Sequence, residues 1–391
     1  MKKYLCMCIS CAFVFFAKAQ EERLRDYVNP FVGTDGYGNI YPGSQIPFGG
    51  IQISPDTDNH FYDAASGYKY SHPTIMGFSL SHLSGTGIPD LGDFLFVPGT
   101  GEIKSIPGTH ENPDEGYRSR YSHEKEWASP GYYGVELIDY GVKAEMTSAC
   151  RSGIFRFTYP ASDKAFILVD LNHTLWQSCP WSNLRQLNDS TIVGYKLVKG
   201  WGPERHIYFA ATFSRKLEHF YILQDGKPVI YNTKRFRSHK EAWGEKLMAC
   251  FTFSTHTGEE VYVKTAISGV STEGALANIN ELDGLTFESV KSRAEELWEK
   301  ELGKYHVAGD LKTKRTFYTS AYHAALHPFV FQDADGRYRE LDKNIGRAEG
   351  FTNYTTFSLW DTYRAFHPLL NLVNQPLQAN IANSMLAHYD K

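Results

Sequence analysis

The sequence of 391 residues has few cysteines, and their positions exclude a disulfide framework. Only six are present, and half of them lie near the start, before Phe16. Cys150, Cys179 and Cys250 remain, so at most one disulfide can form within the rest of the chain, and no zinc-type spacing is present.

An excess of basic charge is also absent. With 40 Lys and Arg against 44 Asp and Glu, the formal net charge is −4. No basic patch is interleaved with aromatic residues, which argues against nucleic acid as a partner. The glycine-rich segment 31–50 lacks the Lys-Ser/Thr of a phosphate-binding loop and opens no G-x-G-x-x-G helix. It predicts either a close backbone approach to a ligand or, as we favour, tight turns that brace a sheet domain.

Long apolar runs are absent except at the N-terminus, where residues 1–19 predict a secretory signal peptide. Lys2 and Lys3 precede an apolar run that ends at Phe16, and Ala17-Lys18-Ala19 is a small-x-small cleavage site before Gln20. The run continues past Cys11, which argues against lipidation there. No other stretch approaches the roughly 18 apolar residues of a membrane span. We expect an exported protein, periplasmic or extracellular.

Aromatic residues are abundant at 15%, which favours β-strands and also provides surfaces on which sugar rings stack. A β-rich core accounts for most of them. Period-two alternation or compact apolar runs, separated by turn residues, predict an antiparallel sandwich. The expected strands are 135–140, 143–147, 152–159, 164–171, 191–197, 206–213, 220–224, 247–253 and 260–267.

The periodicity becomes helical after residue 283. Residues 283–302 place Phe287, Val290, Ala294, Leu297 and Trp298 on one face. A second helix is expected at 312–327, with Phe317 and three alanines as its apolar face and Pro328 as its end. Two more are expected at 357–372 and 374–388.

Residues 76–94, MGFSLSHLSGTGIPDLGDF, predict a polar, glycine-rich loop between two short apolar pieces. Such a loop, framed by strands, suits the binding of a polyhydroxylated ligand. His82 and Asp93, which flank the turn at Gly85, can exchange hydrogen bonds with sugar hydroxyls. Alternatively, both side chains only hold the loop in place.

Two further patterns favour structural roles. His323 and His327 have helical metal-ligand spacing, but no acidic third ligand accompanies them. Residues 333–338, DADGRY, fail the EF-hand pattern and predict an Asp-Gly turn.

Ser358-Leu-Trp-Asp-Thr-Tyr-Arg is the sharpest motif of the helical part. Read with Tyr27-Val-Asn-Pro-Phe-Val-Gly-Thr and the 76–94 loop, it resembles glycoside hydrolase family 92, the calcium-dependent exo-acting α-mannosidases. The resemblance covers nearly the whole chain after residue 19. A simple Asp361–Arg364 pair on one helical turn is the structural alternative for this motif, and such a pair contributes little.

The resemblance implies an α+β multidomain fold. Its parts are an N-terminal antiparallel β-sandwich (20–268), a helical linker (269–310) and the first helices of an incomplete (α/α)6 barrel (311–391). The unfinished ring would expose apolar faces around Phe317, Leu326 and Leu369.

The resemblance also implies the site. Asp361 would contact the mannose in the −1 subsite, with Trp360 and Arg364 as support and His82, Asp93 and Gly85 in a loop that reaches the same site. The family's general acid, general base and most calcium ligands are expected beyond Lys391. We therefore assign no catalytic residue and no metal ligand to this chain, and expect the fragment alone to be inactive.

The expected function is the hydrolysis of terminal α-linked mannose, with an α-1,2 linkage preferred, from mannose-containing glycans with inversion. The alternative is a carbohydrate-binding or interaction module without catalysis.

Overall fold

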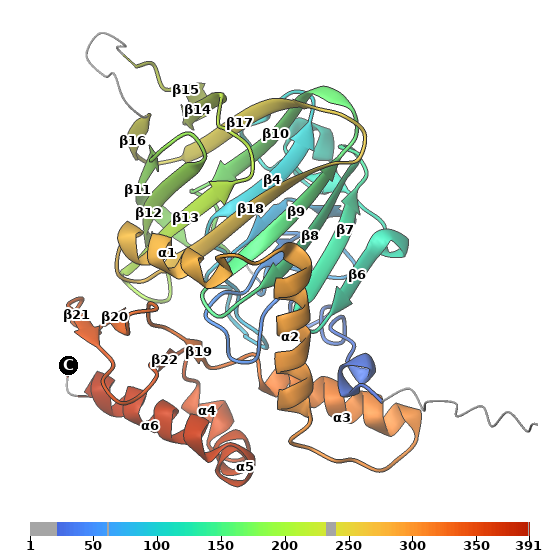
Figure 1. The fold of residues 1–391 in the computed structure, drawn as a ribbon, viewed down its shortest axis with the longest axis vertical. Helices are drawn as coiled ribbons and strands as arrows, with labels where there is room; N and C mark the ends of the chain where they lie inside the picture. The colour runs from blue at the N-terminus through green and yellow to red at the C-terminus, as the bar shows by residue number, and fades with distance from the viewer. Residues whose placement is uncertain (1–21, 61, 232–239, 390) are drawn as a thin grey trace, which may run out of the picture.

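The computed structural model describes residues 22–60, 62–231, 240–389 and 391, so the expected signal peptide lies outside the described residues. Residues up to Ser268 form mostly β-sheet, and helices follow (Figure 1). This part of the fold agrees with the sequence-based expectation. Cys150, Cys179 and Cys250 are all free thiols.

Two antiparallel sheets form the sandwich. In order, the seven-stranded sheet contains β1 (Ser54–Asp56), β3 (Gly77–Ser79), β4 (Leu95–Thr100), β10 (Ser162–Asp170), β17 (Leu247–Thr255), β14 (His219–Gln224) and β15 (Lys227–Pro228). The nine-stranded sheet contains β16 (Glu241–Gly244), β11 (Ser178–Gln186), β12 (Thr191–Lys199), β13 (Arg205–Phe213), β18 (Glu259–Ser268), β9 (Ser152–Tyr159), β8 (Val142–Ser148), β7 (Tyr132–Leu137) and β6 (Glu126–Ser129). All nine strands expected from the sequence are present. Strand β11 was missed because its sequence, SCPWSNLRQ, lacks clear alternation.

Aromatic rings fill the space between the two sheets. Phe96 of β4 lies 5.1 Å from Phe155 of β9, and Phe213 of β13 lies 5.7 Å from Phe251 of β17, measured between ring centroids. The side chains of these four residues are at most 4% exposed. The high aromatic content is therefore used mainly in the core, as burial of such large side chains favours.

The helical part begins with α1 (Thr272–Ile279), which packs on the outer face of the nine-stranded sheet through Ala275 and Ile279. Helix α2 (Phe287–Leu302) starts with a reciprocal cap between Thr286 and Ser289. It buries the expected face except at Leu297, which is 42% exposed; Leu302 is buried instead.

Helix α3 (Leu311–Ala324) buries Tyr318, Thr319 and Tyr322. Of the expected apolar face, only Ala325, just after the helix, is buried; the rest is half-buried. Tyr318 stacks on Tyr27 with ring centroids 5.7 Å apart, and Tyr322 lies 4.5 Å from Trp298. Two small hairpin-like pairs follow: β19 (Phe329–Val330) with β22 (Tyr354–Thr355), and β20 (Arg337–Arg339) with β21 (Ile345–Arg347). The expected Asp-Gly turn precedes β20, with Gly336 at φ 84°.

The expected helix 357–372 is instead two helices, α4 (Leu359–Thr362) and α5 (Phe366–Val373). Pro368 explains the break. In a continuous helix its ring would clash with the carbonyl of residue 364, whereas in the first turn of α5 no such carbonyl is in the way. Helix α6 (Gln375–Tyr389) follows.

The glycine-rich segment joins the sandwich to the helices, which supports the bracing interpretation. The indole Nε1 of Trp298 donates to the carbonyl of Gln45 at 2.7 Å, and the amide of Gln45 donates to the carbonyl of Leu326 at 2.9 Å. The backbone N–H of Phe48 donates to Ala325 at 2.8 Å. These buried bonds fix the helical part relative to the loop at 80–94.

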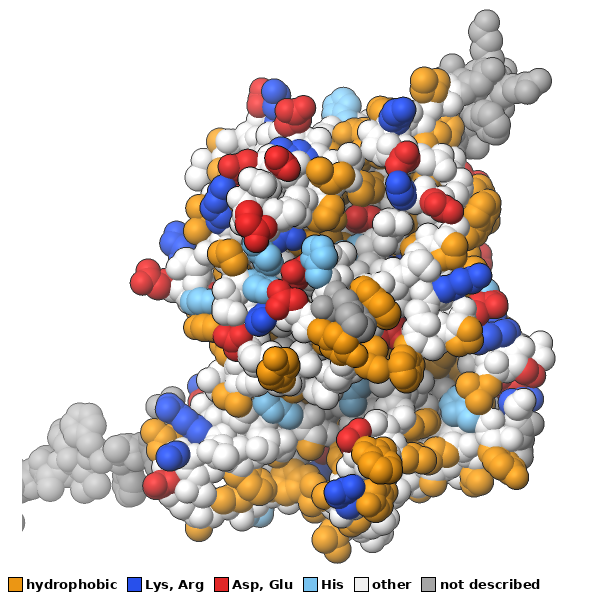
Figure 2. All heavy atoms as spheres, turned by 180° about the vertical axis from the view of Figure 1, so that it is seen from behind, with side chains coloured by type: hydrophobic (Ala, Val, Ile, Leu, Met, Phe, Trp, Pro, Cys, Tyr) orange, Lys and Arg blue, Asp and Glu red, His pale blue; other side chains and the backbone are white. Residues whose placement is uncertain are grey.

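Exposed apolar side chains gather on the helical part. Figure 2 shows hydrophobic side chains on the lower part of the molecule, below the sandwich. Leu326, expected to be exposed, is instead fully buried, and Phe317 and Leu369 are half-buried. The large exposed apolar residues of the segment 359–389 are Leu359, Trp360, Tyr363, Leu372, Leu386 and Tyr389.

Candidate functional site

The loop after β3 is held by a buried network around His82. Its Nδ1 donates to the carbonyl of Gln52 at 2.8 Å, and its Nε2 lies 2.7 Å from Asp56 Oδ1. His173 binds the other oxygen of the same carboxylate at 2.7 Å. Burial alone would raise the pKa of Asp56, but the two imidazoles outweigh it and hold that pKa well below its ordinary value. His82 is 0% exposed. Both ring nitrogens thus have partners within the protein, and in this structure His82 holds the loop; its contact with a sugar stays a prediction.

Asp93 closes the same loop. It accepts from the hydroxyl of Ser81 at 2.6 Å and forms a two-pronged contact with Arg205 at 2.6 and 3.1 Å. The ammonium of Lys196 lies 3.1 Å away. Burial favours a raised pKa for Asp93, but the two cations hold it well below its ordinary value. With these partners both oxygens of the carboxylate are occupied, so Asp93 holds the loop in this structure; its contact with a sugar stays a prediction.

The loop tip, in contrast, lines a pocket of about 700 Å³. Residues 83–88 form one wall, and residues 356–358 with the following helical turns form the other. Gly85 belongs to the first wall; it has φ +69°, and a Cβ there would meet nothing within 4 Å. Its backbone is therefore accessible to a ligand, which suits the role expected for it. The pocket joins segments from the sheet and helical parts that are far apart in sequence.

Asp361 lies in the opposite wall, in the first turn of α4. One of its oxygens accepts from the hydroxyl of Ser358 at 2.5 Å, and the other has no hydrogen-bond partner among the described residues. The carboxylate is exposed and can accept further hydrogen bonds. The side chains of Trp360 and Arg364 do not line this pocket. Trp360 is 81% exposed, and the Arg364 guanidinium lies over the Tyr363 ring.

His327 is a pocket residue whose site role was not expected from the sequence. Neither ring nitrogen has a partner in hydrogen-bond geometry, although the ring is mostly buried. Burial lowers the pKa of His327 to about 4, and the nearby carbonyl of His82 offsets this only in part. The imidazole is therefore neutral at neutral pH and offers one donor and one acceptor. Its helical spacing from His323 was visible in the sequence, but that pattern indicated a metal pair or a structural role.

Asp90, Trp201 and His367 complete the polar and aromatic lining missed in the sequence. Burial raises the pKa of Asp90, while Arg205 opposes this effect. His367 is oriented by Thr362 Oγ1 and Gln378 Oε1, each at 3.0 Å. A ligand in this pocket would meet carboxylate and imidazole groups together with the rings of Phe357 and Phe366. That combination is typical of a site for a polar ligand with apolar faces.

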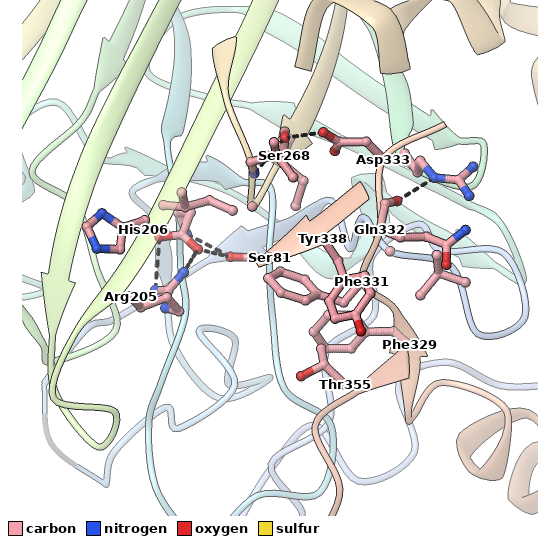
Figure 3. A pocket seen from close by; sticks show the side chains of 18 of the residues that line it. Ser81, Arg205, His206, Ser268, Phe329, Phe331, Gln332, Asp333, Tyr338 and Thr355 are labelled. Carbon is pink, nitrogen blue, oxygen red and sulfur yellow. Dashed lines mark hydrogen bonds and ion pairs between the residues drawn. The ribbon is translucent and has the colours of Figure 1, made fainter. Parts of the chain in front are cut away.

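A smaller cavity of about 140 Å³ lies between the sandwich and β19–β22 (Figure 3). The rings of Phe329, Phe331 and Tyr338 crowd its apolar side, and Arg205 and Ser81 lie on the side of the sandwich. Its lining includes Leu91 and Thr356, which also line the larger pocket. The small cavity is therefore an inner neighbour of the candidate site.

The larger pocket does not form a calcium cage. Calcium takes six to eight oxygen ligands. Asp90 and Asp361 are the only carboxylates among the described lining residues. The residues present thus do not fit the ion, and no step is assigned to it here.

The chain belongs to a family of sugar-cleaving enzymes. Residues 27–268 match the glycosyl hydrolase family 92 N-terminal domain, and residues 274–391 match the glycosyl hydrolase family 92 catalytic domain. The protein is therefore a member of glycosyl hydrolase family 92, as the motifs at Tyr27, the 76–94 loop and Trp360 indicated.

Solved structures agree. The family GH92 α-mannosidase of Bacteroides thetaiotaomicron is 76% identical, with a TM-score of 0.93 over 95% of this chain and 50% of that chain. The same enzyme has been solved with mannoimidazole. A family GH92 inverting mannosidase of the same organism is 24% identical, with a TM-score of 0.80 over 95% of this chain and 49% of that one. The chain thus spans about half the length of the solved relatives it matches.

An uncharacterized secreted glycosidase of Arthroderma benhamiae is 25% identical over 327 residues, which are 77% of this chain and 41% of that protein. Among the described residues of the present chain, none of the helices is long and apolar enough to cross a membrane.

Proposed function

We propose that the protein containing this chain is an exported exo-α-mannosidase that removes terminal α-linked mannose, with α-1,2 linkages preferred, from mannose-containing glycans. The observation that carries the proposal is the pocket between residues 83–91 and α4, with the free carboxylate oxygen of Asp361 in its wall. Family membership supports it, and the complex of a 76% identical enzyme with mannoimidazole supports the choice of sugar.

Binding in this pocket follows from its geometry. The ionised carboxylate of Asp361 accepts hydrogen bonds from two neighbouring hydroxyls of one sugar, an arrangement that is stronger than neutral pairs. Gly85 lets the loop backbone approach the ring, and His327 supplies a neutral donor and acceptor. Because the Asp93 and His82 networks hold the loop, little ordering is needed when the sugar binds.

Catalysis needs groups that we do not assign here. Inversion requires an acid carboxyl and a base carboxylate about 6.5–9.5 Å apart, with room for water between them. We propose that these groups, and the ligands of the calcium on which the activity depends, are supplied by the part of the enzyme that relatives have beyond this length. Asp361 and the loop hold and orient the sugar. We further propose an incomplete (α/α)6 barrel, with domain limits of 20–268, 269–310 and 311–391, and Trp360 and Arg364 as residues that support Asp361.

The substitution Asp361→Asn in the full-length enzyme tests the site. An amide keeps the shape but loses the negative charge, so we expect a loss of about 1.5–3 kcal/mol in transition-state stabilisation. That loss corresponds to roughly 10–150-fold in kcat/KM on an α-mannoside. The matched control is Glu296→Gln, an exposed carboxylate on α2, which should leave activity unchanged.

Unchanged kcat/KM in Asp361→Asn would refute the assignment, as would a variant that loses its fold, since that would make Asp361 structural. The binding-module alternative predicts that the full-length protein binds mannose without releasing it from glycans. Export is tested separately: intact mass of the secreted protein should place its N-terminus at Gln20, and a retained Met1 would contradict the signal peptide.

A further inference from the structure

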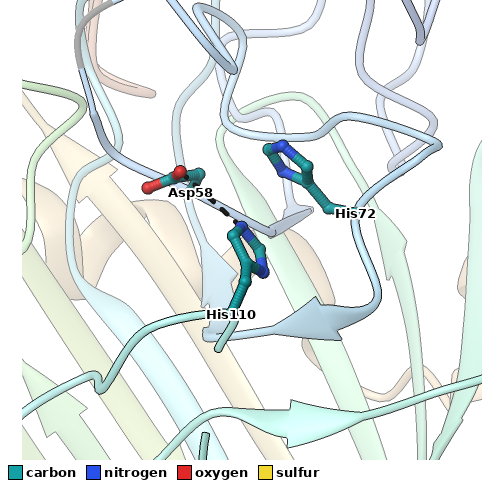
Figure 4. A group of neighbouring side chains, drawn as sticks. All are labelled: Asp58, His72 and His110. Atoms are coloured by element: carbon teal, nitrogen blue, oxygen red, sulfur yellow. Dashed lines mark ion pairs between the residues drawn. The ribbon is translucent and has the colours of Figure 1, made fainter. Parts of the chain in front are cut away.

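A second cluster of side chains that can bind metal ions lies in the sandwich part. Asp58 follows β1, His72 precedes β2 (Thr74–Ile75), and His110 lies between β4 and β5 (Ser119–Arg120). Figure 4 shows the three side chains converging from these separate segments. Each offers one ligand atom, and these atoms all lie within 4.8 Å of one another. Among the described residues, this is the only group of three or more His, Cys, Asp or Glu side chains with that spacing.

We propose that Asp58, His72 and His110 bind a divalent transition-metal ion, Zn²⁺ or one of similar chemistry, as a structural site of this domain. The proposal does not depend on the mannosidase activity. Two imidazoles and one carboxylate suit zinc, cobalt or nickel. They do not suit calcium or magnesium, which prefer oxygen ligands throughout. A solvent molecule would complete a four-coordinate site, because all three side chains are 7–18% exposed.

The contact between His110 and Asp58 carries the argument. His110 Nε2 is buried and has no hydrogen-bond partner, and it lies 3.6 Å from Asp58 Oδ2. That distance is too long for an ordinary hydrogen bond of about 2.7–3.2 Å. It is close to the separation of about 3.4 Å between two ligand atoms bound tetrahedrally at roughly 2.0–2.1 Å from one zinc ion. The two atoms are thus placed to share an ion rather than a proton.

The surroundings orient the carboxylate. Asp58 Oδ1 accepts from the backbone N–H groups of Asn59 at 2.7 Å and His60 at 3.1 Å, and it also bonds to the His60 ring. Oδ2 is therefore left to face the cluster. Such outer contacts are typical of metal ligands.

The two imidazoles are held in a similar way. Both ring nitrogens of His72 have partners at 3.0 Å, Thr57 Oγ1 at Nδ1 and Asp63 Oδ2 at Nε2. Binding the ion would therefore replace one of these hydrogen bonds, and the other would orient the ring. His110 Nδ1 lies 2.9 Å from Thr74 Oγ1, to which it can donate while Nε2 binds the ion.

One neighbour opposes the ion. The guanidinium of Arg118 lies 3.0 Å from His110 Nδ1. Its positive charge weakens cation binding, and Asp63 on the other side of His72 counters it only in part, since Lys69 pairs with Asp63 at 2.7 Å. The same guanidinium also contacts Thr74 Oγ1 and the carbonyl of Thr57, so it keeps acceptors when His110 Nδ1 becomes a donor.

The test is a metal titration of the full-length protein, stripped with a chelator and then kept in millimolar calcium so that oxygen-rich sites are filled. Co²⁺ is added while its visible d–d absorption is followed, and Zn²⁺ is then used to displace it. We expect one equivalent of Co²⁺ with a tetrahedral spectrum. His72→Gln and His110→Gln should each weaken binding at least tenfold. The control His256→Gln, whose ring is 79% exposed in a distant turn, should bind as the wild type does.

A wild-type protein without a one-equivalent site would overturn the proposal, as would unchanged binding in a double variant of His72 and His110. Histidine footprinting with diethyl pyrocarbonate, read by mass spectrometry, requires no variant. Zn²⁺ should protect His72 and His110 but leave His256 reactive. Equal modification with and without the ion would contradict the site even if the variants fail to fold.

Discussion

The two walls of the candidate pocket differ in how they are held. On the side of the sandwich, the 80–94 loop is anchored by side chains whose polar groups are paired, His82 with Asp56 and Asp93 with Arg205. On the helical side, Asp361 lies on α4, which has no buried residue. The first wall is therefore preorganised by its own domain. The second depends on short helices whose apolar side chains, such as Leu372 at 83% exposure, mark a surface for further packing.

The largest effect is expected from a substitution in the first wall, the 80–94 loop. Asp93→Ala leaves the buried Lys196 and the partly buried Arg205 without a counter-charge, and such losses cost about 3–5 kcal/mol. We expect the free energy of unfolding, measured by urea denaturation, to fall by that amount. The control Lys246→Ala removes an ion pair with Asp225 in which both side chains are more than half exposed, and it should change little. Equal effects in the two variants would show that burial of the first pair does not matter.

The next largest effect is expected from acid, which should destabilise the helical part at a higher pH than the sandwich. Burial lowers the pKa of His323 and of His327 to about 4, below the ordinary value near 6.5. The unfolded chain thus binds more protons between these values. The stability these rings support is complete above about pH 6.5 and is lost as pH falls, by about 2 kcal/mol for each imidazole at pH 5.

The sandwich should lose stability only at a lower pH. The lowered pKa values of Asp56 and Asp93 keep their contribution intact until pH falls below about 4. Hydrogen exchange at pH 7 and pH 5 should therefore show lost protection in α3 while the strands stay protected. His323→Phe should remove its share of this change, and His256→Gln should not. Uniform loss of protection in both regions would be the contrary result.

The smallest effect on stability is expected at the exposed helical face. Leu372→Ser and Leu386→Ser alter side chains that are 83% and 62% exposed, so the free energy of unfolding should change by no more than about 0.5 kcal/mol. Leu370→Ser, at 2% exposure, should cost several kcal/mol, as core truncations do. Exposed apolar side chains favour association, so sedimentation should show less self-association in the two surface variants than in the same chain without the substitutions. A large loss of stability in either one would mean that this face is already packed.

The sequence predicted nine of the sixteen strands of the two large sheets, most of helix α2 and the family, because period-two and helical patterns and the motif at Trp360 are local. It also predicted Gly85 and Asp361 as sugar-contacting residues; the structure brings both to one pocket, and the contact itself stays a prediction. The helix break at Pro368 was equally local and was missed only because the apolar run continues across it.

Tertiary structure alone decided what His82 and Asp93 do. Both residues suit sugar binding by chemistry, but Asp56 lies 26 positions and Arg205 112 positions away, and these distant partners bury and saturate them. The same holds for His327, which packing leaves with no partner at the pocket, and for the cluster of Asp58, His72 and His110. The sequence specifies which hydrogen-bond donor and acceptor groups each side chain carries. Whether they are already satisfied depends on long-range contacts that no local pattern reports.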